Sequence, residues 1–181
     1  MKVLFIGVFD ENKKSTNTSQ LLAFKQIGCH VVGYNYRKKA LSIGVNERDE
    51  HMVKSVQRGN FSLVVFSKCN QVSYDVFSAI TKETKTCLWF MDPLISYNEE
   101  MKRKTSLVDY FCCDKENVLE EALKINKNSF HVCEGFDEDV DKPYDLQKEY
   151  DVSFIGNIYG NRKEAIMNIE HKVELINGVF G

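Results

Sequence analysis

The sequence has 181 residues, 43% of them hydrophobic and 28% charged, and its 24 basic and 26 acidic side chains give a formal net charge of −2. This composition is typical of a globular domain and excludes a disordered or low-complexity chain. The charge balance also argues against a general nucleic-acid-binding protein, which carries a basic excess, although the basic runs at 13–14 and 37–39 leave a local patch open.

Apolar runs and helical patterns alternate along most of the chain. The apolar runs predict strands at 2–8, 31–36, 61–67, 86–91, 108–113 and 130–133. Helical periodicity and end signals predict helices at 15–27, 47–57, 74–82, 98–106 and 117–125. In the first helix the side chains expected to be buried are Leu21, Leu22, Phe24 and Ile27. The alternation predicts an α/β fold, a doubly wound and mostly parallel Rossmann-like sheet with helices on both faces.

The pattern then breaks and restarts. An acidic stretch at 137–150, which contains Pro143, is expected to be a linker that closes a first domain at 1–150. The elements expected beyond it, in a second domain at 151–181, are a strand at 151–156, a helix at 162–169 and a strand at 173–176. A single βαβ unit cannot bury both of its faces, so we expect it to pack on the first domain, on a second copy or partner chain, or on residues that this sequence lacks.

No segment of the sequence resembles a membrane span or a signal peptide. The longest apolar run, residues 61–66, is far too short to cross a bilayer. The apolar start of the chain is about five residues long and is followed by Asp10 and Glu11, which a signal peptide would not have there. We therefore expect a soluble, cytoplasmic protein.

The cysteine and histidine spacings point to no metal site. The six cysteines include no CxxC pair, and most of them lie in or at the end of apolar runs. Reduced, buried thiols are therefore expected. The four histidines are scattered, and we expect neither a metal nor a cofactor.

Candidate binding residues follow the predicted strands, because an open parallel sheet binds ligands beyond the carboxyl ends of its strands. The residues predicted to bind a substrate there are Gly7, Asp10, Ser15, Thr16, Asn17, Lys68 and Asn70. The polar run at 15–19 precedes a helix, so it serves either as a helix cap or as a polar cradle for a hydroxyl-rich or anionic ligand.

Asp92 is the candidate catalytic residue. It directly follows an apolar strand, where a carboxylate would act as a general base or bind sugar hydroxyls. It also precedes Pro93, and Asp before Pro is a common way to open a turn, so a purely structural role stays open.

Two well-known nucleotide-binding patterns are missing. The loop after the first strand has a single glycine, Gly7, where a dinucleotide-binding fingerprint needs GxGxxG, and the sequence holds no Walker A pattern. An NAD enzyme and a P-loop NTPase are therefore not expected.

Two segments carry a resemblance to a known family. The first runs from Tyr150 to Glu164 and reads YDVSFIGNIYGNRKE, and the second is Glu134-Gly135-Phe136-Asp137 followed by Lys142-Pro143. Together they resemble the domain junction of GT-B glycosyltransferases, most closely the CgeB-like, spore-maturation-type glycosyltransferases. The resemblance covers the chain in architecture but only about residues 130–165 in motif.

The resemblance implies transfer of a sugar from a nucleotide-sugar to an acceptor in the cleft between two Rossmann-like domains. The first domain would hold the acceptor, and Gly156, Asn157 and Arg162 match the start of the domain that holds the donor. Glu134-Gly135-Phe136 imitates a donor-domain motif but lies before the linker, so it receives no donor-binding role. The family's donor domain is far longer than the 31 residues that follow Tyr150. We therefore expect a glycosyltransferase half that is incomplete without a donor-binding part.

Two other hypotheses stay open. The chain could be a non-catalytic Rossmann-like module that binds a nucleotide, a glycan or a protein, or closes a dimer through residues 151–181. It could also be a response-regulator-like or other flavodoxin-like domain. Asp10 and Glu11 fit the acidic pair of a response regulator loosely, but the third strand ends in Ser67-Lys68-Cys69 without a phosphoacceptor aspartate.

Overall fold

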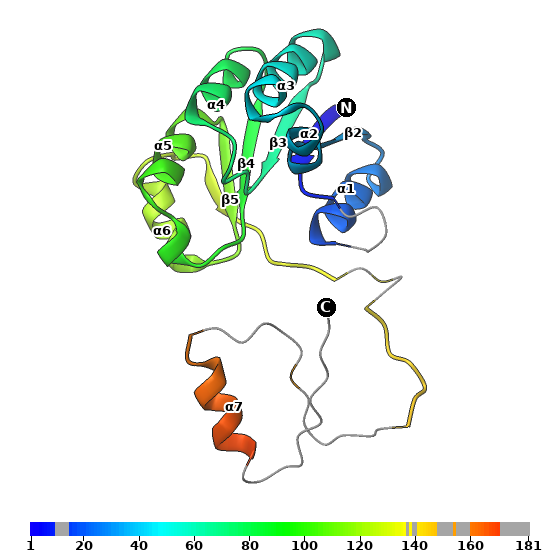
Figure 1. Ribbon diagram of the computed structural model, residues 1–181, viewed down its shortest axis with the longest axis vertical. Coiled ribbons are helices and arrows are strands. Elements are labelled where there is room, and N and C mark those ends of the chain that lie inside the picture. Colours follow the sequence, from blue (N-terminus) through cyan, green and yellow to red (C-terminus); the bar gives the residue numbers. More distant parts are fainter. Residues whose placement is uncertain (10–14, 137, 139–140, 148–153, 155–159, 171–181) are drawn as a thin grey trace. The chain divides into compact units, whose positions relative to one another are not determined.

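The computed structural model describes residues 1–9, 15–136, 138, 141–147, 154 and 160–170 (Figure 1). The chain divides into two compact units, Met1–Asp137 and Glu138–Gly181. The first unit holds the sheet and the candidate site.

Strands and helices alternate along the first unit as predicted. In chain order they are β1 (Lys2–Gly7), α1 (Thr16–Gln26), β2 (His30–Asn35), α2 (Tyr36–Ile43), α3 (Val45–Gly59), β3 (Leu63–Ser67), α4 (Tyr74–Thr81), β4 (Thr86–Phe90), the 3-10 helix η1 (Leu94–Ser96), α5 (Glu99–Leu107), β5 (Tyr110–Cys113), α6 (Glu116–Leu123) and β6 (Ser129–His131). Each predicted strand of this unit is present within two residues of its expected ends.

The six strands form one parallel sheet in the order β2-β1-β3-β4-β5-β6. Phe5 of β1 is paired with Gly33 of β2 on one side and with Val65 of β3 on the other. The chain moves from β1 to one edge and then returns past it, so the order reverses between β1 and β3. The predicted α/β, doubly wound, Rossmann-like fold is confirmed, in the strand order of its flavodoxin-like variant.

The two faces of the sheet are covered unequally. Helices α2 to α6 contribute to the larger apolar core, which holds Phe66, Phe77 and Phe111. The smaller core on the opposite face is built on Val3, Phe5 and Val65 and receives Leu21 and Phe24 from α1. Among residues 1–136, α1 is the helix that contributes to that smaller core, so Tyr110 and Phe130 keep 42% and 45% of their surface exposed.

The burial predicted for the first helix is only half correct. Leu21 and Phe24 pack against the smaller core, whereas Leu22 and Ile27 are exposed. The prediction fails at those two positions because α1 packs near the edge strand β2, where a narrow stripe of the helix suffices to cover the sheet.

Besides the short η1, one helix of the first unit was not predicted. Tyr36 was expected to end the second strand, but it begins α2, whose cap is Asn35 with its side-chain oxygen accepting a hydrogen bond from the Lys38 amide at 3.0 Å. The helix ends at Gly44, which has φ of 86°. Strand and helix therefore join without a loop, and this junction places Tyr36 and Arg37 at the carboxyl edge of the sheet.

The second unit has one described element, α7 (Arg162–Glu170), close to the predicted helix at 162–169. The Arg162 guanidinium lies 6.0 Å from the centre of the Phe154 ring. The strands predicted at 151–156 and 173–176 lie outside the described residues, apart from Phe154.

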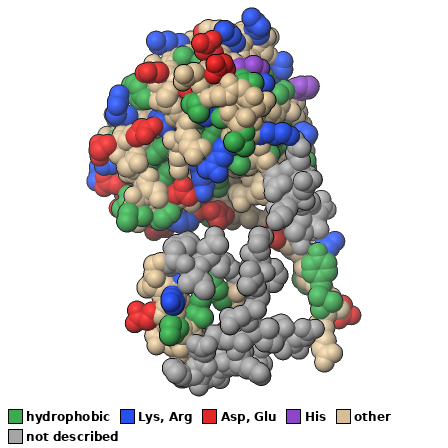
Figure 2. All heavy atoms as spheres, in the orientation of Figure 1, with side chains coloured by type: hydrophobic (Ala, Val, Ile, Leu, Met, Phe, Trp, Pro, Cys, Tyr) green, Lys and Arg blue, Asp and Glu red, His purple; other side chains and the backbone are tan. Residues whose placement is uncertain are grey.

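Two sequence predictions about the whole chain concern membranes and cysteines. Within the described residues, no helix is long and apolar enough to cross a membrane. All six cysteines are free; four are buried, Cys29 is half-buried and Cys133 is exposed. On the face of the molecule in Figure 2, acidic and basic side chains are intermixed over the first unit.

Candidate functional site

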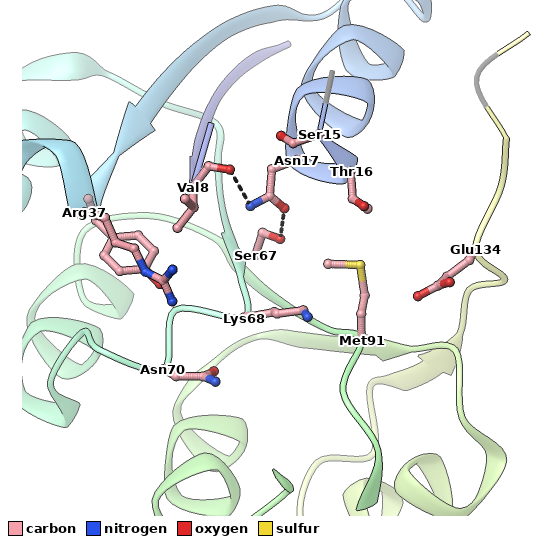
Figure 3. Close-up of a pocket in the computed structure, with 11 residues that line it drawn as sticks. Val8, Ser15, Thr16, Asn17, Arg37, Ser67, Lys68, Asn70, Met91 and Glu134 are labelled. Carbon is pink, nitrogen blue, oxygen red and sulfur yellow. Dashed lines mark hydrogen bonds between the residues drawn. The ribbon is translucent and has the colours of Figure 1, made fainter. Parts of the chain in front are cut away.

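A cavity of about 310 Å³ lies at the point where the strand order reverses. Its walls come from the carboxyl ends of β1, β3 and β4, the N-termini of α1 and α2, and the segment after β6 (Figure 3). The lining residues are Val8, Ser15, Thr16, Asn17, Tyr36, Arg37, Ser67, Lys68, Asn70, Met91 and Glu134. A volume of this size matches the smaller ligand-binding pockets of proteins.

Asn17 fastens α1 to the ends of two strands. Its side-chain nitrogen donates to the Val8 carbonyl at 3.1 Å, and its side-chain oxygen accepts from the buried Ser67 hydroxyl at 2.6 Å (Figure 3). Gly7 makes this possible, because a Cβ at that position would lie 3.0 Å from the Asn17 side-chain nitrogen. These bonds fix the start of α1 at the wall of the cavity.

The first turn of α1 also has a side-chain cap. The Ser15 hydroxyl accepts from the Thr18 amide at 3.3 Å, so the capping role considered for the polar run is present. The earlier amides of a helix have no partner within the helix itself, and the N-terminus carries partial positive charge. Ser15, Thr16 and Asn17 line the cavity at this end of α1.

Lys68 enters the cavity from a strained turn. Lys68 and Cys69 have φ of 58° and 55°, a left-handed conformation that is uncommon for residues other than glycine. The turn is closed by a bond of 2.7 Å from the Cys69 amide to the Ser67 carbonyl. Backbone strain of this kind concentrates at functional sites, where the surrounding structure holds it.

The predicted catalytic residue Asp92 is paired with Lys68. The Lys68 Nζ lies 2.6 Å from an oxygen of Asp92, whose side chain is 24% exposed. Asp92 directly follows Met91, which lines the cavity, but does not line it itself. The ion pair therefore holds a carboxylate beside the cavity in a fixed orientation.

Arg37 and Tyr36 form the wall beside β2. Tyr36 is buried, and burial is the main reason that its pKa is raised above the ordinary value. The buried Arg48 of α3 lies 5.8 Å from the Tyr36 ring and donates to the Gln71 carbonyl at 3.0 Å. Arg48 thus ties this wall to the turn that carries Lys68 and Asn70.

Four polar side chains in the cavity have no carboxylate or amide partner in this framework, although Arg37 also hydrogen-bonds the Tyr36 side chain. Among the described residues, no side chain forms a salt bridge with Arg37 or Glu134, and none hydrogen-bonds the Thr16 hydroxyl or the Asn70 amide. In Figure 3, Arg37 and Asn70 lie on one side and Glu134 lies on the other. The cavity thus presents a cation, neutral hydrogen-bonding groups and an anion.

Five of the residues predicted to bind a substrate line this cavity: Ser15, Thr16, Asn17, Lys68 and Asn70. Gly7 lies under Asn17, and Asp92 contacts Lys68. Asp10, Gly156 and Asn157 lie outside the described residues, and Arg162 begins α7 of the second unit.

The prediction left out Arg37, Ser67 and Glu134. Each of them follows or ends a strand at the carboxyl edge, so position was a usable signal for all three. Within the described part of the chain, no group of histidine, cysteine, aspartate and glutamate is arranged to hold a metal ion.

Comparison of the chain with protein-family models, with curated proteins and with solved structures gave no match. The geometry of the cavity is therefore the basis for a functional proposal.

Proposed function

We propose that residues 1–137 bind a hydroxyl-bearing small molecule in this cavity, as the acceptor-side half of a glycosyltransferase of the GT-B type. The observation that carries the proposal is the cavity itself, at the reversal of the strand order and lined by hydroxyl and amide side chains. Ligands of open α/β sheets bind at this position. The assignment to glycosyl transfer rests on the resemblance of the segments around 130–165.

In this proposal Asp92 is the general base. The carboxylate would take the proton of the acceptor hydroxyl while that oxygen forms its bond to the sugar carbon and the nucleoside diphosphate leaves with the electron pair of the broken bond. Lys68 would act as a positioning residue through its 2.6 Å ion pair. The parts that bind the nucleotide-sugar would come from a donor-binding half, to which Gly156, Asn157 and Arg162 are proposed to belong.

Calorimetric titration of the full chain with a panel of neutral hexoses tests the binding step. We expect at least one hexose to bind, and Asn17→Ala to weaken it by about tenfold because the start of α1 loses its anchor. The matched control is Asn126→Ala, since Asn126 also donates from its side chain to backbone carbonyls, those of Thr105 and Val108. A folded chain that binds neither a hexose nor a hexose phosphate would overturn the proposal.

The ion pair between Lys68 and Asp92 also favours a second candidate, a non-catalytic binding module, because the carboxylate already has a partner. Incubation of the chain with nucleotide-sugars and each hexose that binds separates the two candidates. A glycosylated product that falls by about a hundredfold or more in Asp92→Asn identifies a transferase. Binding that is unchanged in Asp92→Asn, without product, favours the module.

A further inference from the structure

The unused polar groups of the cavity differ in charge from one side to the other. Arg37 lies opposite Glu134 in Figure 3, with Asn70 on the side of Arg37 and the Lys68 ammonium between Arg37 and Glu134. Among the described residues, Lys68 has a carboxylate partner and Arg37 has none. A ligand that satisfies both ends must carry negative charge at one end and neutral hydrogen-bond donors at the other.

From this arrangement we infer that the ligand of the cavity is a phosphate ester of a hydroxyl-bearing molecule, with its phosphate beside Arg37 and Lys68 and its hydroxyl groups toward Glu134. The inference rests on the proposed function, because it names the chemical class of the molecule that this cavity binds.

The side of the cavity that holds Arg37 suits a phosphate in three respects. The planar guanidinium offers several donors to phosphate oxygens, and the Lys68 ammonium has three donors of which Asp92 uses one. The N-termini of α1 and α2 both border the cavity, and that of α2, which holds Arg37, lies on this side, where its positive end favours an anion. Asn35 and Ser15 cap the third amides of these helices, those of Lys38 and Thr18, rather than the first amides.

The opposite side suits hydroxyl groups. An ionised carboxylate only accepts hydrogen bonds, so Glu134 would accept from sugar hydroxyls and repel a second phosphate. Thr16, on the same side as Glu134 in Figure 3, offers a further neutral partner. A molecule with one phosphate and several hydroxyls therefore fits better than a bisphosphate or a neutral sugar.

The inference is tested by calorimetric titration of the full chain with hexoses, with their 1- and 6-phosphates, with uridine monophosphate and with inorganic phosphate. We expect a phosphate ester to bind about tenfold or more tightly than its neutral parent, because hydrogen bonds to charged groups are the stronger class. Raising the salt concentration should weaken the binding of the phosphate ester and leave the binding of the neutral sugar nearly unchanged. The sugar phosphate and uridine monophosphate arms distinguish a phosphosugar from a nucleotide.

The matched variants are Arg37→Gln and Arg58→Gln. Both remove one exposed arginine charge, but Arg58 lies in the last turn of α3, at the amino edge of the sheet. We expect Arg37→Gln to remove most of the difference in affinity between the phosphate ester and its neutral parent. Arg58→Gln should keep that difference. The salt dependence of phosphate-ester binding to the unaltered chain is a second measurement, and it does not require any variant to fold.

Three results would bear on the two proposals differently. If neutral hexoses bind and their phosphates bind no more tightly, the phosphate inference is overturned and the proposed function stands. If phosphate esters bind no more tightly than inorganic phosphate and no neutral hexose binds, the cavity is an anion site only, and both the acceptor proposal and the hydroxyl contacts of the inference are overturned. If a folded chain binds none of the probes, both are overturned.

Discussion

Lys68 is the residue at which local strain and the candidate site coincide. Its backbone adopts φ of 58°, which costs an ordinary side chain about 1–2 kcal/mol relative to the right-handed region. The conformation directs the ammonium to within 2.6 Å of Asp92 while Lys68 lines the cavity. A relaxed turn would lower this cost but would move the cation.

Lys68→Gly should therefore fold more stably than Lys68→Ala, by about 1 kcal/mol. Both variants remove the ion pair, but only glycine relieves the left-handed backbone. The free energy of unfolding in urea measures the difference. The same two substitutions at Lys54, inside α3, should give the opposite order, since alanine is favoured by about 1 kcal/mol in a helix interior. Equal stability of the two Lys68 variants would contradict strain at this turn.

At the scale of elements, the joint between β4 and β5 depends on one carboxylate. An oxygen of Asp109 accepts from the Thr86 amide at 2.9 Å and from the Thr86 hydroxyl at 3.1 Å, and the other lies 2.6 Å from the Lys85 ammonium. Burial raises the pKa of Asp109, but the hydrogen bonds from Lys85 and Thr86 outweigh it and lower the pKa below the ordinary 3.8.

Because the folded-state pKa of Asp109 is lowered, its contribution to stability is present at neutral pH and is lost as pH falls through the folded-state value. We expect Asp109→Asn to be less stable than the unaltered chain by about 1–3 kcal/mol near pH 7, and the difference to shrink in acid. Urea unfolding at about pH 7 and at steps below about pH 4 measures this.

The control for Asp109 is Glu121→Gln on α6. The pKa of Glu121 is also lowered, through a hydrogen bond from Lys124, but this pair lies at the exposed surface. Exposed ion pairs contribute little, so this variant should match the unaltered chain at each pH. A stability difference for Asp109→Asn that does not change with pH would contradict the role of its ionised form.

The elements themselves were predictable to very different degrees. Strand β3 was evident because its run of apolar residues is buried on both faces. Helix α2 was missed because Tyr36 is its only buried residue and a basic run follows it. Its cap, Asn35, is also the last residue of β2, so no loop separates the two elements.

At the scale of the molecule, the strand order decides which predicted residues meet. Ser15, Lys68 and Asn70 were predicted from their positions after strands, but the sequence could not say that β3 lies next to β1. Because β3 lies beside β1, the Ser67 hydroxyl can donate a hydrogen bond to Asn17, and the segments that follow these two strands line the same cavity. Asp92, two strands from β1, contacts Lys68 beside the cavity.

The cysteines report on the integrity of the whole fold. Burial raises the pKa of Cys69 and Cys113, and a contact with Cys87 together with burial raises that of Cys112. Cys133 is exposed. Since the thiolate is the reactive form, iodoacetamide should modify Cys133 first, Cys29 more slowly, and the four buried cysteines only on unfolding. Peptide mapping by mass spectrometry checks the order, and rapid native modification of Cys69 would contradict the packing.

The measurement that tests the central claim most directly is a map of backbone amide chemical shifts in the labelled chain during titration with a hexose phosphate. The claim predicts the largest shifts at 15–17, 36–37 and 67–70, the segments that meet at the cavity. It predicts little change at Gly59, Thr84 and Asn128, at the opposite edge of the sheet. Shifts centred on that opposite edge, or none at saturating ligand, would contradict a binding site at the reversal of the strand order.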